Sequence, residues 1–299
     1  MVRRTASDLL GKTIFSDATL RPSEGWWPLC LGKVRNQGWT LVINPLCPLG
    51  NAGFLAGNHT PIWPGGLKHR ERTPPMPDPD PSACHLCGAS TRGLGHLHGR
   101  QYRQCGTCDL IMVPHKWHLP PDLARARYAL HENTLANAGY VARLEEVLRV
   151  LKAHAAGARR VLDFGCGPGP VLVELLQRAG FDAVGFDPYF AATVDMAGPF
   201  DAVVSTEVFE HFDRPADEMR RICEVLPPGG LLIVMTEFHR GPESFAQWHY
   251  PRDPTHVAFY SRRTMDWMAG AYGYVIRHDN GRNLVAFRRI GRGGVPGPA

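Results

Sequence analysis

The short stretch VLDFGCGPG, residues 161–169, constrains the fold more than any other part of this chain. It places Gly165, Gly167 and Gly169 between an apolar, strand-like run and a run with helical periodicity. Glycine lets the backbone turn sharply and lets a ligand approach where a Cβ would stand in the way. The pattern therefore predicts a strand that turns into a helix around a bound ligand.

The C-terminal half of the chain continues this alternation of strand-like and helix-like runs. We expect strands over residues 159–165, 182–188, 200–208 and 230–238, helices over 170–180 and 215–226, and a hairpin over 273–289 that turns at Asn280–Gly281. Strands that alternate with helices predict a parallel sheet with helices on both faces.

An acidic residue stands where a ribose would need it. Asp187 ends the second expected strand, eighteen residues after Gly169, and a carboxylate there can accept both hydroxyls of a ribose. The glycine spacing is G-x-G-x-G rather than the G-x-G-x-x-G of dinucleotide binders. A nucleotide-dependent oxidoreductase that uses NAD is therefore the second enzyme hypothesis.

The stretch VLDFGCGPG, Asp187 and LPPGGLLIV (residues 226–234) together resemble class I S-adenosylmethionine-dependent methyltransferases over about residues 130–290. The resemblance implies an α/β, Rossmann-like sheet of seven strands with a C-terminal antiparallel hairpin. It also implies that S-adenosylmethionine lies over the glycine loop, with its amino-acid part near the residues Asp163, Gly165, Gly167 and Gly169 and its ribose at Asp187. The third strand would fall in residues 189–199, which are short and poorly patterned, so no adenine contact is assigned.

The acceptor side is expected at STEVFEHF, residues 205–212, which contains Glu207, Glu210 and His211. If a helix starts here, these three side chains share one face. In one hypothesis His211 or one of the two glutamates takes a proton from an acceptor hydroxyl. In another they bind a divalent cation such as Mg²⁺ or Mn²⁺ together with His256. A purely structural role is the third alternative.

The E-x-x-E-H pattern resembles that of ubiquinone-pathway O-methyltransferases and small-RNA 2′-O-methyltransferases, in which it implies a divalent cation. The loop QWHYPRDPTHVAFYS, residues 247–261, follows the last parallel strand and should lie at the same sheet edge. We expect its aromatic side chains to form pocket walls, namely Trp248, His249, Tyr250 and Tyr260. Arg252 and Asp253 are expected to pair with each other, unless Arg252 meets an anionic acceptor.

Four of the eight cysteines form two C-x-x-C pairs, Cys84 with Cys87 and Cys105 with Cys108, separated by seventeen residues. Two such turns facing each other predict tetrahedral coordination of a structural zinc ion. Four reduced thiols in a small core are the alternative. A four-cysteine module before such a domain also resembles sugar C-methyltransferases, so methylation of carbon and of oxygen both stay open.

The chain divides into five segments on these patterns. We expect a disordered N-terminal extension and linker over residues 1–82, a zinc ribbon or knuckle over 83–120, linking helices over 121–156, a domain that binds S-adenosylmethionine over 157–291, and a disordered tail over 292–299. Met76, inside the proline-rich end of the extension, is one hypothesis for the native start.

Charge and hydropathy limit the classes of partner that we expect for this chain. Residues 1–83 hold nine Lys/Arg and six Asp/Glu, whereas residues 84–299 hold 24 and 22, so no broad basic face is indicated. No run is long and apolar enough to span a bilayer, and no secretory signal is recognised. We expect a cytoplasmic enzyme with a small-molecule acceptor, and no feature indicates an oligomeric state. A zinc ribbon that binds nucleic acid or protein, attached to an inactive domain, is the non-enzyme alternative.

Overall fold

The structure is a computed structural model of the 299-residue chain. It describes residues 30–33, 39–42, 82–130, 133–193, 196 and 198–291. The expected extension over residues 1–82 and the expected tail over 292–299 therefore lie almost wholly outside the described residues. Within the extension, β1 (Cys30–Lys33) and β2 (Trp39–Val42) pair antiparallel in a unit that spans Met1–His69. The other described elements belong to a second unit, Arg70–Ala299.

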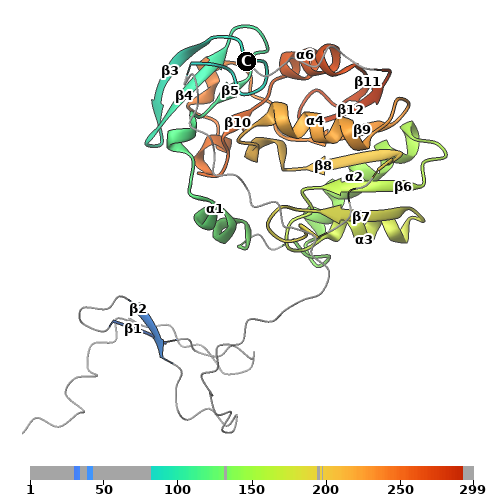
Figure 1. The fold of residues 1–299 in the computed structure, drawn as a ribbon, viewed down its shortest axis with the longest axis horizontal. Coiled ribbons are helices and arrows are strands. Elements are labelled where there is room, and N and C mark those ends of the chain that lie inside the picture. Colours follow the sequence, from blue (N-terminus) through green and yellow to red (C-terminus); the bar gives the residue numbers. More distant parts are fainter. Residues whose placement is uncertain are drawn as a thin grey trace, which may run out of the picture. The chain divides into compact units, whose positions relative to one another are not determined.

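The second unit contains a sheet of six strands in the order β11-β12-β9-β8-β6-β7 (Figure 1). Its strands are β6 (Arg160–Phe164), β7 (Asp182–Phe186), β8 (Ala202–Thr206), β9 (Leu231–Met235), β11 (Tyr274–Asp279) and β12 (Leu284–Arg289). The first four run parallel, whereas β12 is antiparallel to both β9 and β11. The predicted Rossmann-like sheet with a C-terminal antiparallel hairpin is confirmed.

The sheet departs from the sequence-based expectation in its number of strands. The resemblance implied seven strands, whereas the described residues form six. The remaining strand would come from residues 189–199, where the described part forms turns and one isolated bridge, between Asp187 and Ala191. This segment lacks the regular alternation of apolar and polar residues that a strand at a sheet edge requires.

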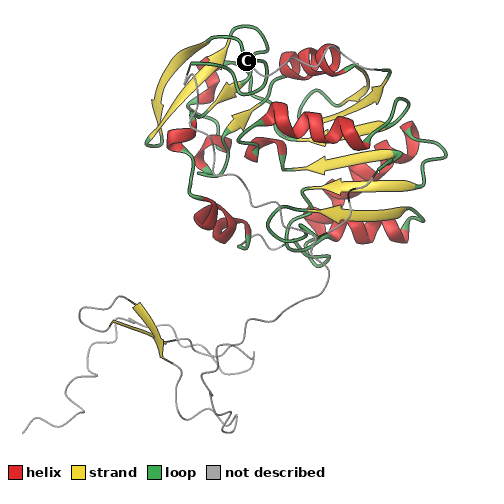
Figure 2. Ribbon diagram, viewed as in Figure 1, coloured by secondary structure: helices red, strands yellow, loops and turns green. Residues whose placement is uncertain are grey.

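Two helical layers cover the sheet, one on each face (Figure 2). The helices are α2 (Ala138–His154) and α3 (Val171–Arg178) on one face and α4 (Pro215–Val225) and α6 (Arg262–Tyr272) on the other. Neighbouring residues of β6 show the alternation, since Val161 packs with α2 and α3 while Leu162 packs with α4 and α6. None of the described helices has both the length and the apolar character that crossing a bilayer takes.

Helix α2 is a component of the sheet domain as well as a connection to it. Its N-terminus is capped by Asn137, whose Oδ1 accepts the backbone N–H of Tyr140 at 3.1 Å. Its apolar residues Leu144 and Val147 are buried against the sheet. This packing places part of the expected linking segment, residues 121–156, inside the core.

The segment with the four cysteines, which we call the cysteine module, contains a small sheet and two short helices. Its elements are β3 (Thr91–Leu97), β4 (Arg100–Cys105), β5 (Ile111–Met112), η2 (His115–Trp117) and α1 (Pro121–Tyr128). A further strand, β10 (Ala258–Phe259), comes from the chain beyond β9 and pairs antiparallel with β5. The resulting order, β10-β5-β4-β3, joins the cysteine segment and the sheet domain through backbone hydrogen bonds.

The chain between β9 and β11 crosses the carboxyl edge of the large sheet. It contains α5 (Pro242–Phe245), η4 (Tyr250–Arg252), β10 and α6. We did not predict α6 from the sequence. A capping box between Ser261 and Thr264 begins it, and Gly273 ends it in the left-handed conformation, at φ 72°.

Packing of α2 on the sheet can be tested by truncating Leu144, which is 1% exposed. Leu144→Ala should lower the free energy of unfolding by about 2–5 kcal/mol, because it leaves a cavity between α2 and the sheet. Urea denaturation of the full chain measures this. Glu145→Ala, at the exposed neighbouring position, should change stability by no more than about 0.5 kcal/mol. Equal stability of the two variants would show that α2 is not part of the core.

Candidate active site

The four predicted zinc ligands lie together. The Sγ atoms of Cys84 and Cys108 are 3.5 Å apart, those of Cys87 and Cys105 are 3.4 Å apart, and all four lie within 4.8 Å of one another. A tetrahedral zinc ion with bonds of about 2.3 Å holds its sulfur ligands about 3.8 Å apart. The donor set and its spacing therefore fit zinc. Four thiolates close the coordination shell, which suits a structural ion.

The glycine loop connects β6 to α3, and close contacts explain two of its glycines. A Cβ on Gly165, which has φ +94°, would lie 2.5 Å from Val208 Cγ2, and one on Gly169 would lie 2.5 Å from the carbonyl oxygen of Asn133. A Cβ on Gly167 would meet nothing within 4 Å. The loop therefore offers open space over Gly167, between two positions where only glycine fits.

Asp163, in β6 just before this loop, is fully buried, and its Oδ1 has no hydrogen-bond partner among the described residues. Burial, with a further contribution from the negative charge of Asp187, raises the pKa of Asp163 from 3.8 to about 7. A buried carboxyl oxygen without a partner is costly. A ligand with an amino or ammonium group would supply the missing donor.

Asp187 follows β7 and ties that strand to the glycine loop. Its Oδ2 accepts the N–H of Gly167 at 3.1 Å, and its Oδ1 accepts the N–H groups of Tyr189 and Phe190 at 2.8 and 3.1 Å. Each carboxylate oxygen can accept more than one hydrogen bond, so ribose hydroxyls are still compatible with this arrangement. Asp187 therefore has a structural role in addition to its predicted role in ligand binding.

A buried carboxyl group, that of Glu210, and a half-buried one, that of Glu207, meet at one phenol. The hydroxyl of Tyr250 lies 2.6 Å from Glu210 Oε1 and 3.3 Å from Glu207 Oε2, while the hydroxyl of Thr236 donates to Glu210 Oε2 at 2.8 Å. Burial and the charge of Glu210 raise the pKa of Glu207 to about 8, and burial raises the pKa of Glu210 to about 7.

The expected common face of Glu207, Glu210 and His211 is not formed. Glu207 adopts a left-handed conformation, at φ 55°, and only a single turn of 3₁₀ helix follows, η3 (Phe209–His211). As a result, Glu207 and Glu210 meet at Tyr250, whereas the ring of His211 is directed toward the carbonyl oxygen of Thr255. Glu210 belongs both to this cluster around Tyr250 and to a second cluster, with His211 and His256.

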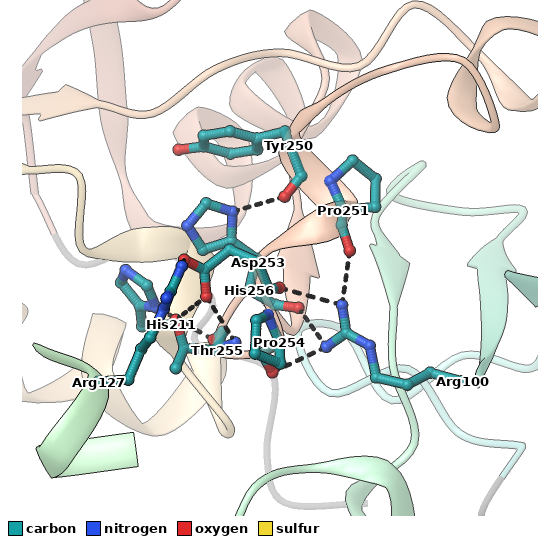
Figure 3. Close-up of polar contacts among 9 residues, drawn as sticks. All are labelled: Arg100, Arg127, His211, Tyr250, Pro251, Asp253, Pro254, Thr255 and His256. Carbon is teal, nitrogen blue, oxygen red and sulfur yellow. Dashed lines mark hydrogen bonds and ion pairs between the residues drawn. The ribbon is translucent and has the colours of Figure 1, made fainter. Parts of the chain in front are cut away.

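His211 and His256 come together from the segments that follow β8 and β9, with ring centroids 4.8 Å apart (Figure 3). His211 Nδ1 lies 3.0 Å from the carbonyl oxygen of Thr255, and His256 Nδ1 lies 2.9 Å from that of Tyr250. Because a carbonyl oxygen only accepts, both Nδ1 atoms carry hydrogen, which leaves a lone pair on each Nε2. Single ligand atoms of Glu210, His211 and His256 lie within 4.8 Å of one another.

The pKa values of these groups separate the two functional hypotheses for the acceptor side, proton transfer and cation binding. Burial and the charge of His211 lower the pKa of His256 to about 3, and burial lowers the pKa of His211. An imidazole that is so hard to protonate is a poor base near neutral pH but a good cation ligand. Glu207, whose pKa lies near 8, is better matched to accepting a proton.

Some aromatic residues of the loop over residues 247–261 lie beside the carboxyl groups, and others lie in the core. Trp248 stacks on Tyr250 with centroids 4.9 Å apart, and its indole N–H donates to Glu237 at 3.1 Å, so these rings border the carboxyl groups. His249 lies beside them with a side chain that is 68% exposed. Tyr260 is fully buried and donates to the carbonyl oxygen of Phe209, so its expected role as a pocket wall is wrong.

Helix α1 contributes contacts that the sequence did not indicate. Asp253 pairs with Arg127 of α1 at 2.9 Å, so the expected pair of Asp253 with Arg252 is wrong. The ring of Tyr128 packs edge-on against His211, with centroids 5.0 Å apart. No local pattern signals these contacts, because the partners are more than eighty residues apart in the chain.

Comparison with known proteins adds a family match. The family described as "Methyltransferase domain" matches residues 124–279, more than half of the chain.

Two curated relatives and one solved structure illustrate the similarity. Ubiquinone biosynthesis O-methyltransferase of Caulobacter sp. (strain K31) is 35% identical over 102 residues, which cover 26% of this chain and 40% of that protein. The protein of the same name from Bradyrhizobium diazoefficiens is 33% identical over 120 residues, covering 32% and 47%. An O-methyltransferase family protein from Burkholderia thailandensis has 16% identity and a TM-score of 0.37, covering 56% and 62%. The chain thus spans less than half the length of these two curated relatives.

The unpartnered carboxyl of Asp163 predicts a pH dependence of stability. Its folded-state pKa, about 7, lies above its ordinary value of 3.8, so its contribution is present below about pH 4 and is lost as the pH rises to 7. The loss amounts to at most about 4 kcal/mol, at 1.36 kcal/mol for each pKa unit. Urea denaturation between pH 4 and 8 should show this decline in the wild type and a flatter profile in Asp163→Asn. Superimposable profiles would contradict the assignment.

Proposed function

The chain belongs to the methyltransferase domain family, and we propose that it transfers a methyl group from S-adenosylmethionine to a small-molecule acceptor. The observation that carries the proposal is the glycine loop with two aspartates at one edge of the sheet. Gly167 leaves open space there, Asp163 has a buried oxygen in need of a donor, and Asp187 holds the end of the next strand.

Each group has a definite task in this proposal. The amino group of the donor would meet Asp163, the ribose hydroxyls would meet Asp187, and the amino-acid part would lie along Gly165, Gly167 and Gly169. The sulfonium of the donor supplies an already activated methyl group. The protein therefore has to align the acceptor and remove a proton from it.

We propose that the acceptor atom is a hydroxyl oxygen. The acidic groups of Glu207, which is half-buried, and Glu210, which is buried, support this, because a carboxylate with a raised pKa can take the proton that the oxygen loses. The curated relatives are named O-methyltransferases, which agrees with oxygen as the acceptor. Trp248 and Tyr250 would form the wall against which the acceptor packs.

Glu210, His211 and His256 would hold a divalent cation such as Mg²⁺ or Mn²⁺. Two neutral imidazoles, each fixed by a hydrogen bond at Nδ1, together with one carboxylate form a donor set that suits such an ion. A bound cation would lower the pKa of the acceptor hydroxyl and orient it. In this arrangement Glu207 is left to accept the proton.

The four cysteines would hold zinc as a structural ion, and thiols kept for a metal fit the reducing cytoplasm. The two alternative functions have less support. The glycine spacing disfavours NAD, and the cysteine module is built into the sheet domain through β10 rather than standing apart as a binding module.

Calorimetric titration with S-adenosylhomocysteine tests donor binding. The zinc-loaded wild type should bind one equivalent, and Asp187→Ala should weaken binding by about 100-fold or more, because two hydrogen bonds to a charged group are lost. Asp182→Ala, at the exposed opposite end of the same strand, is the matched control and should bind normally. Equal affinity in Asp187→Ala would remove the ribose assignment. If the folded wild type binds NAD and not S-adenosylhomocysteine, the proposed function is wrong.

Titration with Mn²⁺, followed by electron paramagnetic resonance, tests the cation site. Zinc-loaded wild type should bind one Mn²⁺, and His256→Ala should bind it at least about 10-fold more weakly, because a ligand is lost. His249→Ala removes a nearby exposed imidazole and should leave binding unchanged. Identical titrations for wild type and His256→Ala would exclude this cation site.

A further inference from the structure

One arginine of the cysteine module fixes the backbone of the loop that carries His256 (Figure 3). Arg100 begins β4 and is 7% exposed. Its guanidinium donates to four backbone carbonyl oxygens of one short loop: those of Pro251 at 2.8 Å, Pro254 at 2.9 Å, His256 at 3.0 Å and Asp253 at 3.1 Å. Four carbonyl dipoles thus surround one buried positive charge.

These carbonyl groups alternate with the ones that orient the two histidines. His256 Nδ1 donates to the carbonyl of Tyr250, directly before the first carbonyl that Arg100 holds. His211 Nδ1 donates to the carbonyl of Thr255, between two others that Arg100 holds. A shift of this loop would therefore turn both imidazole rings at once.

Strand β4 links the loop to the cysteine cluster. Arg100 is its first residue and Cys105 its last. Next to β4, β5 pairs with β10, whose first residue lies two positions after His256. The loop is thus held at both ends by the module, through the guanidinium and through a backbone ladder.

We propose that Arg100 is a positioning residue for His211 and His256, and that the cysteine module is the scaffold of the acceptor-side loop. This proposal rests on the proposed function, because it takes the two histidines as ligands of the proposed cation site. Arg100 does not itself reach the candidate ligand atoms and acts through the loop backbone.

Charge and shape explain why arginine stands here. A guanidinium presents five N–H donors in a planar fork and can bond several carbonyl oxygens at once. The ammonium of lysine is a more compact charge with three donors, and glutamine is uncharged with two. Lysine at position 100 should therefore hold the loop only partly, and glutamine should release it.

Hydrogen exchange read by mass spectrometry on the zinc-loaded full chain tests the proposal. In Arg100→Gln, amides of the peptide over residues 250–257 should exchange at least about 10-fold faster than in the wild type, since hydrogen bonds to a charged group are lost. Peptides from β6 and α3 should be unchanged. Arg100→Lys should fall between the two.

Arg103→Gln is the matched control. Arg103 lies in the same strand, but its guanidinium bonds to Thr91 inside the module and not to the loop. This variant should leave exchange of the 250–257 peptide at the wild-type rate. Loop exchange that is unchanged in Arg100→Gln, or raised equally in Arg103→Gln, would overturn the proposal, as would a uniform rise across the whole chain.

Removing zinc from the wild type gives a second test without any substitution. Chelation should speed exchange in the 250–257 peptide as well as around the cysteines, because β4 and β5 lose their anchor. A rise confined to the cysteine segment would show that the module does not support the loop.

The exchange measurements require neither donor, cation nor acceptor, so their outcome is separate from that of the proposed function. Calorimetry with S-adenosylhomocysteine on Arg100→Gln should give the wild-type affinity, because the glycine loop lies on other strands. In the same variant, Mn²⁺ should bind at least about 10-fold more weakly. Wild-type Mn²⁺ affinity in Arg100→Gln would contradict the positioning role.

Discussion

Four parallel strands end at one edge of the sheet, and this constraint brings together groups that are far apart in the sequence. At that edge, β6 continues into the glycine loop, β7 into Asp187, β8 into Glu207, and β9 into Thr236 and the loop with His256. In open α/β sheets, ligands bind beyond the carboxyl ends of the strands. The proposed donor and acceptor sites are therefore neighbours because of the strand direction.

Polar groups are buried on the acceptor side of this edge, and the cost of burying them is offset by specific hydrogen-bond partners. Glu210 receives hydrogen bonds from Thr236 and Tyr250, and each of the two histidines donates to a backbone carbonyl. Buried polar networks fix one arrangement only when each member has its partner. The cysteine module contributes here through Arg100, whose guanidinium holds the loop that carries His256.

The strands of the large sheet and most of its helices could be predicted from the sequence, whereas α6 was missed and the acceptor side could be predicted only in part. Strands with continuous apolar runs and the glycine loop carry their signal locally, and the C-x-x-C pairs do too. The shared face of Glu207, Glu210 and His211 depended on an α-helix starting at Glu207, and a left-handed residue and a 3₁₀ turn stand there instead. The contacts of Arg100 and Arg127 could not be predicted, because they join segments more than a hundred residues apart.

A crystal structure of the zinc-loaded protein with S-adenosylhomocysteine and Mn²⁺ would test the central claim most directly. We expect the ribose at Asp187, the amino group at Asp163, and the sulfur directed toward the edge where Glu210, His211 and His256 surround the ion. S-adenosylhomocysteine bound elsewhere, or with its sulfur facing away from that edge, would contradict the proposed methyl transfer.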